Sequence, residues 1–362
     1  MIKELKITNL NNKYSNIYKF KEDINILTGK NGCGKTTLMK LMWYLASGNI
    51  DKLFDELTID YAKLTTFSGS SLELIVFENE DKIKSLTLNV VSIENNYNIS
   101  HTIPIINLDS IPKYTTTSGS LFFPTFRRIE GGFTTTTNHS TRQKYRRNIL
   151  REAFDSISEN LTTSSEHKFI ASISTEDINY LLSNKYADIS EEIRKLEATQ
   201  SKNILNIVSN STEKEKESLE NIRNLVKEND KNKDDILRPF YILSGLIKQI
   251  FKDKSIKISN NLELGEAKEA INSDKLSAGE KQMLSFLCYN FFYDNSIIFI
   301  DEPELSLHTD WQRLLFPILL KQKKGNQFII ATHSPFIYSK YPDKEIIIDY
   351  DKGQKNELEE NE

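Results

Sequence analysis

The feature that most constrains the fold is a glycine-rich segment at residues 29–36, GKNGCGKT, which lies between an expected strand and an expected helix. Residues 23–27 are typical of a short buried strand, and residues 36–45 carry apolar side chains at helical spacing. Glycines allow the backbone to wrap its amide N–H groups around phosphate oxygens, and the next helix presents its positive end to them. The order predicts a phosphate-binding loop, with Lys35 on the β- and γ-phosphates and Thr36 placed for Mg²⁺.

Two further apolar strands are expected to end in polar groups at the same sheet edge. Residues 296–300 run into Asp301 and Glu302. An aspartate at this point can bind Mg²⁺, and the next carboxylate can orient and deprotonate a water molecule. The strand at 328–331 is followed by His333, which we interpret as a sensor of the γ-phosphate because imidazole can hydrogen-bond phosphate without a full charge.

A third element, Leu276-Ser277-Ala278-Gly279-Glu280, predicts a helix start. Ser277 can cap the helix, and the small first turn leaves backbone N–H groups and a hydroxyl available to an anion. This element has no expected ligand within its own subunit. It therefore predicts that a phosphate held by a second copy of the chain binds there.

The pattern along the chain predicts an α/β fold built from both chain ends. Residues 59–106 alternate between apolar and polar positions, as in an antiparallel β subdomain. Residues 142–254 have helical spacing, but we expect this stretch to be too interrupted for a long coiled-coil arm. The expected domains are an N-terminal ATPase lobe, a helical insertion, a C-terminal ATPase lobe and an acidic tail: 1–141, 142–265, 266–350 and 351–362.

Composition restricts the environment more than the activity. The 362 residues carry a net charge of −4, although a basic cluster lies between Arg127 and Arg151. Two cysteines, Cys33 and Cys288, suit a reducing cytosol better than a disulfide framework. The most apolar stretch, 283–300, is interrupted by polar residues, so we expect no membrane span and a cytoplasmic location.

Together these ordered motifs resemble the ABC-type ATPases of the SMC, RecF and OLD-like branch. The resemblance covers about the first 50 and the last 100 residues. It implies a P-loop NTPase head that pairs with a second head around ATP and Mg²⁺, with the Ser277 segment of each copy contacting nucleotide held by the other. It also implies that Leu305-Ser306-Leu307-His308 forms the D-loop.

The motifs and the resemblance give three sets of expected site residues. The catalytic residues are Lys35, Glu302 and His333, and the metal ligands are Thr36 and Asp301. The residues expected to bind nucleotide are Gly29, Lys30, Asn31, Gly32, Cys33, Gly34, Lys35, Thr36, Thr37, Ser277, Gly279 and Glu280.

Two features depart from the family pattern. No glutamine occurs between Leu38 and Arg142 to serve as the usual Q-loop residue. The expected substitute is the segment 122–130 with Arg127 and Arg128, and Gln143 is a weaker candidate. The chain continues for only about 30 residues after His333, so we expect no Toprim nuclease domain and place any nuclease or toxin activity in another subunit.

Three functions remain open at this stage. The first is an ATP-dependent switch, a dimer or larger oligomer, that gates a separate effector in bacterial anti-phage defence. The second is a repair or recombination ATPase that binds nucleic acid through the region Arg127–Arg151. The third, a transporter subunit, is disfavoured because about 240 residues separate the phosphate loop from the Ser277 motif.

Overall fold

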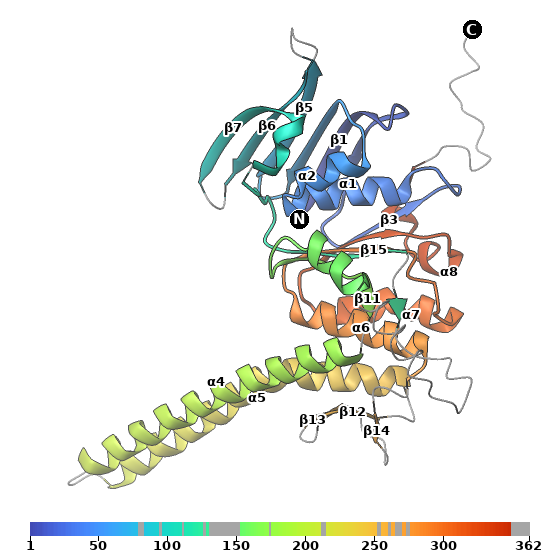
Figure 1. Ribbon diagram of the computed structural model, residues 1–362. Helices are drawn as coiled ribbons and strands as arrows, with labels where there is room; N and C mark the ends of the chain where they lie inside the picture. Colours follow the sequence, from blue (N-terminus) through green and yellow to red (C-terminus); the bar gives the residue numbers. More distant parts are fainter. Residues whose placement is uncertain are drawn as a thin grey trace, which may run out of the picture. The chain divides into compact units, whose positions relative to one another are not determined.

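The computed structural model describes most of the chain, and its contacts divide the protein into two units. The first unit comprises Met1–Ile173, Tyr293–Pro317 and Lys323–Glu362, and the second comprises Ser174–Phe292 and Ile318–Gln322. Figure 1 shows the elements of both. The described residues are 1–78, 83–93, 96–110, 112–125, 128–129, 153–173, 175–210, 215–251, 255–259, 262–264, 270–272 and 276–348.

A six-stranded parallel sheet forms the centre of the first unit. Its strands follow the order β10-β8-β15-β16-β3-β17. In that order they span His167–Phe169, Ser120–Phe123, Ile297–Asp301, Gln327–Ala331, Ile24–Thr28 and Glu345–Ile347. Every residue of β3, β8, β15 and β16 is buried, as expected for parallel strands covered on both faces. The predicted assembly of the core from both chain ends is confirmed.

A second sheet in the same unit is antiparallel, with the order β2-β1-β4-β5-β6-β7. Its strands span Tyr14–Lys19, Ile2–Leu10, Tyr61–Thr66, Ser71–Glu78, Lys84–Ser92 and Tyr97–Pro104. Half-buried and buried positions alternate along β4, because only one face of the sheet packs on the core. This confirms the predicted antiparallel subdomain and adds β1 and β2 to it.

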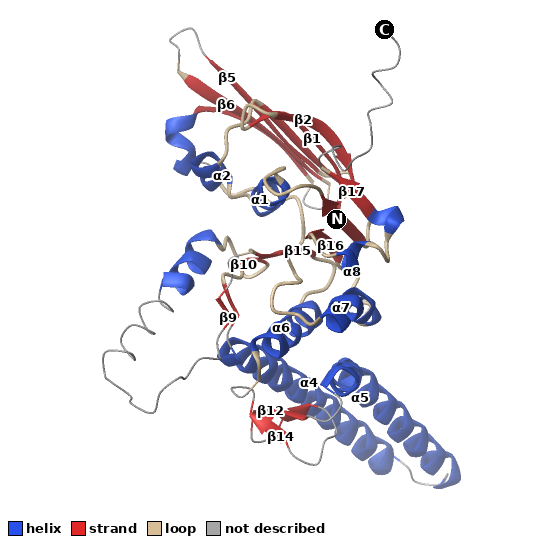
Figure 2. Cartoon of the chain, turned by 90° about the vertical axis from the view of Figure 1, so that its right-hand side faces the viewer, coloured by secondary structure: helices blue, strands red, loops and turns tan. Residues whose placement is uncertain are grey.

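Helix α1, Lys35–Ser47, packs between these two sheets (Figure 2). Its Trp43 ring lies 5.7 Å from Phe122 of β8 and 5.4 Å from Phe169 of β10. The buried aromatic contacts fix the helix over the sheet that it follows in the chain. The remaining elements of this unit are α2 (Ile50–Glu56), η1 (Ile105–Ser110), β9 (Arg128–Ile129), a helix at 153–161, β11 (Ser172–Ile173), α8 (Pro335–Tyr338) and η3 (Pro342–Lys344).

The second unit contains two long helices, α4 at Thr175–Asn210 and α5 at Glu215–Phe251. They pair antiparallel: Tyr186 packs on Phe240 near one end, and Lys233 forms an ion pair with Glu197 further along, at 2.6 Å. Thirty-six helical residues span about 54 Å. The expectation that this stretch is too interrupted for a long coiled-coil arm is therefore wrong. Apolar residues of both helices, such as Leu196 and Leu225, line one groove between them, although Leu205 and Val208 near the end of α4 are exposed.

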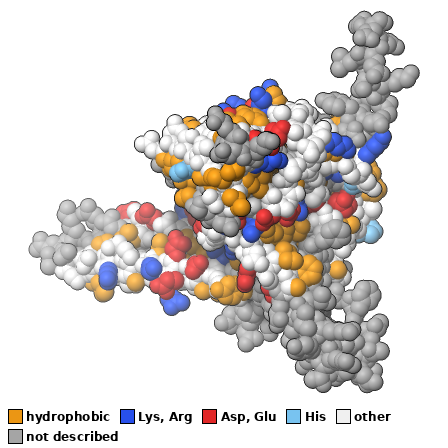
Figure 3. Space-filling model, turned by 45° about the horizontal axis from the view of Figure 1, so that its top comes forward, with side chains coloured by type: hydrophobic (Ala, Val, Ile, Leu, Met, Phe, Trp, Pro, Cys, Tyr) orange, Lys and Arg blue, Asp and Glu red, His pale blue; other side chains and the backbone are white. Residues whose placement is uncertain are grey.

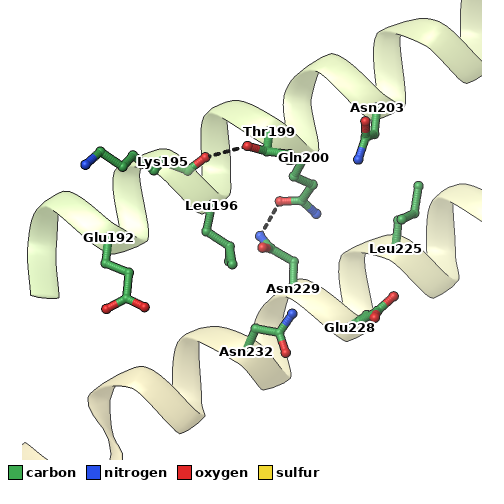
Figure 4. A pocket seen from close by; sticks show the side chains of 10 residues that line it. All are labelled: Glu192, Lys195, Leu196, Thr199, Gln200, Asn203, Leu225, Glu228, Asn229 and Asn232. Atoms are coloured by element: carbon green, nitrogen blue, oxygen red, sulfur yellow. Dashed lines mark hydrogen bonds between the residues drawn. The ribbon is translucent and has the colours of Figure 1, made fainter. Parts of the chain in front are cut away.

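A polar layer interrupts the seam between α4 and α5. The amide of Asn229, which is buried, donates to the Gln200 side chain across a groove of about 440 Å³ (Figure 4). Buried amide pairs of this kind fix the register of paired helices at some cost in stability. Around the seam, acidic, basic and apolar side chains are mixed along the hairpin surface (Figure 3).

Helix α6, Ala278–Phe292, packs against both long helices, with Phe291 5.3 Å from Phe240. Three short strands complete the elements of this unit: β12 (Ser255–Ser259), β13 (Leu262–Leu264) and β14 (Ala270–Asn272). Helix α7, Thr309–Lys321, contains the boundary between the two units. In the described part of the chain, no helix combines the length and the apolar character that a bilayer span requires.

Two strands lie within the stretch that the sequence predicted to be helical. β10 pairs with β8 in the parallel sheet, and β11 pairs with β9. They have three and two residues, which is too short for a periodicity signal. Their strand conformation depends on partners more than 40 residues earlier in the chain.

Candidate nucleotide site

The glycine-rich loop joins the end of β3 to the start of α1. Gly32 and Gly34 have φ angles of 78° and 91°, which a side chain would strain. A Cβ atom on Gly34 would also approach the Tyr14 ring to 3.3 Å. Gly34 is the N-cap of α1, whose first turn has no side-chain cap and no acidic residue. The positive end of α1 is therefore left available to an external anion.

Lys35 lies buried at the centre of this loop. Its ammonium group donates to the carbonyl oxygens of Gly29 and Lys30, at 3.2 and 3.1 Å, and lies 2.9 Å from Nε2 of His333. Because an ammonium group can only donate, His333 accepts through Nε2 and carries its proton on Nδ1. The structure thus brings together Lys35 and His333, which are 298 residues apart in the chain.

Asp301 lies at the carboxyl end of β15 and is 1% exposed. Its Oδ2 atom accepts a hydrogen bond from the Thr36 hydroxyl at 2.8 Å and another from the Thr125 hydroxyl. The parallel register explains the meeting: Asp301 pairs with Ala331 of β16, which pairs with Leu27 of β3, directly before the loop. The two residues predicted to bind Mg²⁺ therefore lie in contact.

Thr125 was not predicted from the sequence. It follows β8 and lies in the segment 122–130 that was expected to replace the Q-loop, where the prediction emphasised arginines instead. Arg127 and Gln143 lie outside the described residues, as does most of the basic region up to Arg151. Arg128 belongs to β9. A polar residue just after a buried strand of this sheet is the signal that could have identified Thr125.

Glu302 follows Asp301 in a left-handed backbone conformation, with φ of 47°, and its N–H donates to the Ala331 carbonyl at 2.8 Å. Burial raises the pKa of Glu302, and the charges of Asp301 and Glu304 raise it further, while His333 and Lys35 oppose the shift. A carboxylate with a raised pKa is a stronger base. This property suits a group that removes a proton from water.

The remaining loop residues differ in their exposure. Lys30, Asn31 and Thr36 are exposed, Thr37 is half-buried and Cys33 is buried. Cys33 Sγ lies 3.9 Å from Lys35 Nζ.

The residues of the Ser277 motif lie in the second unit, whereas the phosphate loop lies in the first. Ser277 is exposed at the start of α6. Its hydroxyl accepts from the Glu280 N–H at 3.3 Å, and its own N–H donates to the Glu280 carboxylate at 2.8 Å. In this reciprocal capping box, side chains of the same helix start accept hydrogen bonds from the backbone N–H groups of Ser277 and Glu280. Gly279 lies half-buried in the same turn.

The sequence matches, over residues 24–339, the family described as "AAA domain, putative AbiEii toxin, Type IV TA system". The chain belongs to this family. The match spans both halves of the site, from β3 to the residues after His333. The matched family is one of AAA domains, and the glycine-rich loop between β3 and α1 agrees with it, so the predicted P-loop NTPase fold is confirmed.

Three curated relatives show similarity of different extent. The chain is 24% identical to the "Retron Ec83 probable ATPase" of Escherichia coli over 88% of its own length and 65% of that protein. It is 38% identical to "Endonuclease GajA" of Bacillus cereus (strain VD045) over 16% of this chain and 11% of that protein. It is 35% identical to "ABC transporter A family member 5" of Dictyostelium discoideum over 24% of this chain and 5% of that protein. The chain therefore spans less than two thirds of each relative.

Similar solved structures include an Smc head domain from Pyrococcus furiosus and RecF. The Smc head, bound to the C-terminal domain of ScpA, has a TM-score of 0.38 at 14% identity, covering 93% of this chain and 91% of the other. The recombination mediator RecF has a TM-score of 0.36 at 12% identity, covering 93% and 94%.

Proposed function

We propose that the chain hydrolyses ATP with Mg²⁺ at the carboxyl edge of the parallel sheet, and that two copies close around the nucleotide to switch a separate effector. The observation that carries the hydrolytic part is the convergence of the loop, Asp301, Glu302 and His333 on one sheet edge. A glycine-rich loop, a carboxylate that can bind Mg²⁺ and a candidate base at one sheet edge support phosphoryl transfer.

The donor set fits a nucleotide with Mg²⁺. Thr36 and Asp301 offer a hydroxyl and a carboxylate oxygen within 2.8 Å of each other, which suits a small cation that prefers oxygen ligands. Thr36 and Asp301 would hold Mg²⁺, which would supply positive charge against the charge that develops on the phosphate. Lys35 would exchange its carbonyl contacts for phosphate oxygens, and the open start of α1 would receive the remaining charge.

Glu302 would accept a proton from the attacking water. Its raised pKa supports this role, because the base must bind a proton transiently near neutral pH. His333 would leave Lys35 and donate a hydrogen bond towards the γ-phosphate position. Lys35, Glu302 and His333 are thus assigned binding, base and sensor roles.

Dimerisation is proposed from the Ser277 motif. Ser277 is exposed and directly precedes α6, so it lies at the positive N-terminal end of that helix. A phosphate from a second copy could replace the Glu280 carboxylate in the capping box, so Ser277, Gly279 and the backbone N–H of Glu280 would complete the site across the interface. The same geometry would permit an assembly larger than a dimer.

The proposed biological role is based on the similarity to the retron ATPase and on the toxin–antitoxin family description. We infer a cytoplasmic ATPase whose nucleotide state gates a separate nuclease or toxin in anti-phage defence. The E. coli retron relative supports this because its similarity extends over 88% of the chain. The alternative, a nucleic-acid-binding repair ATPase, depends on the basic region Arg127–Arg151.

Two measurements test the proposal. Purified protein should release phosphate from ATP only with Mg²⁺, and its mass in solution should double when ATP binds; absence of both would refute the site assignment.

The proposed role in anti-phage defence is tested in cells. Cells that carry the chain with its neighbouring genes should resist phage, and cells with the Glu302→Gln variant should not. A salt-dependent DNA shift lost in the Arg146→Glu/Arg147→Glu double variant would instead favour the repair function.

A further inference from the structure

Glu304 contacts the segment that carries His333 with both of its carboxylate oxygens. Oε2 accepts from the Thr332 hydroxyl and Oε1 accepts from the His333 backbone N–H, each at 2.8 Å. Two charge-assisted hydrogen bonds from one carboxylate fix both the position and the orientation of the segment. Thr332 is 1% exposed, so its hydroxyl has little access to water as an alternative partner.

A second side chain holds the same segment from α7. The Gln312 carbonyl oxygen accepts from the Ser334 hydroxyl at 2.6 Å, and its NH₂ group donates to the Leu307 carbonyl at 2.8 Å. The Ser334 N–H also donates to the Thr332 hydroxyl at 3.0 Å. The residues on either side of His333 are thereby tied to the loop that follows β15.

The loop itself is strained. Glu302 and Ser306 have φ angles of 47° and 67°, conformations that cost non-glycine residues about 1–3 kcal/mol each and persist only when neighbouring contacts enforce them. The Glu304 and Gln312 hydrogen bonds supply such contacts. A change in the conformation of this loop would therefore also move the segment that carries His333.

We propose that Glu304 is a positioning residue that holds His333 against Lys35 and transmits movements of the loop 302–308 to His333. This rests on the proposed ATPase site and deepens it. Leu305 is 41% exposed in the same loop, so a second copy that contacts it would act on His333 through Glu304. The Glu304 carboxylate accepts directly from the His333 backbone N–H, so a single side chain links the loop to the His333 segment.

The first test needs no catalytic activity. The chain has 5 histidines, so the imidazole resonances can be followed by NMR and His333 assigned with His333→Gln. Glu304→Ala should shift the His333 resonances and broaden them, since the ring loses its fixed position. The matched control is Asp310→Asn, which removes a carboxylate from the start of α7 that contacts Arg313 and His308 instead. Unchanged His333 resonances in Glu304→Ala would overturn the proposal.

The second test separates positioning from general stability. Glu304→Ala should lower kcat for ATP about 10- to 100-fold, the loss expected from a misplaced group, while nucleotide affinity stays unchanged. Its Tm should also fall, because the buried Thr332 hydroxyl loses its partner, so kcat is compared well below the Tm of each variant. Thr332→Val should reproduce part of the loss of kcat, and Thr332→Ser should retain activity because it keeps the hydroxyl. Wild-type kcat in folded Glu304→Ala would assign Glu304 a purely structural role.

If the wild-type protein hydrolyses no ATP, the proposed function fails, and the NMR comparison still decides the role of Glu304.

Discussion

Two helix starts in this protein bear on anion binding, and they are built differently. The start of α1 has a glycine N-cap, no side-chain cap and no acidic residue in its first turn. The start of α6 is closed by the reciprocal bonds of Ser277 and Glu280. The first is prepared for an external phosphate, whereas the second must lose an internal carboxylate before it can receive one. Both helix starts were predicted to contact phosphate, yet only the start of α6 already binds a carboxylate of its own chain.

Removing the charge at the open helix start should have the largest effect. Lys35→Ala should abolish ATP binding and turnover, because the loop loses the cation that faces the β- and γ-phosphates. Isothermal titration with ATP measures the binding, and Lys52→Ala on α2 serves as a surface control. Full affinity in Lys35→Ala would show that α1 is not the phosphate site.

Removing the base at the same sheet edge should leave binding intact. Glu302→Gln should slow turnover about 10²- to 10⁴-fold and trap an ATP-bound dimer. Phosphate release and light scattering measure the two effects, with Glu22→Gln before β3 as the control. Unaltered turnover would exclude Glu302 as the base, and slow turnover without a dimer would separate hydrolysis from the α6 contact.

The closed helix start is tested by mixing two inactive variants. Ser277→Arg blocks α6 and Lys35→Ala disables the loop, so each alone should be inactive. Equal mixing should restore about a quarter of wild-type turnover, because half of randomly formed pairs are mixed and each holds one intact site. Failure to recover activity at any mixing ratio would mean that α6 does not complete a site on another copy.

The pH dependence of kcat tests whether Glu302 acts as the base at the sheet edge. Burial, Asp301 and Glu304 raise the pKa of Glu302 above its ordinary 4.5, and a base acts only when deprotonated. We therefore expect kcat to fall as the pH drops through a value above the usual glutamate range. A profile of kcat against pH checks this, and an acid limb at the ordinary glutamate value would contradict the burial of the base.

The smallest effect concerns the capping box alone. Glu280→Ala should destabilise the protein by about 1 kcal/mol, whereas Glu280→Gln should be close to neutral because glutamine can cap in the same way. Urea unfolding measures both. Equal stability of the wild type and the alanine variant would show that the α6 start is more open than its hydrogen bonds indicate.

The sequence by itself determined the glycine-rich loop, the strands that end at Asp301 and before His333, and the antiparallel subdomain. These features depend on local backbone needs and on short-range periodicity, which neighbouring residues encode.

The tertiary structure alone decided the rest. It placed Thr125 on Asp301 and Glu304 on the His333 segment, and it made β10 a strand and α4–α5 a long hairpin. Each depends on partners that are distant in the chain, so only strand register and helix pairing bring them together. The capping box at α6 is different, because Ser277 and Glu280 are three residues apart and the pattern is local, although only Ser277 was predicted as the cap.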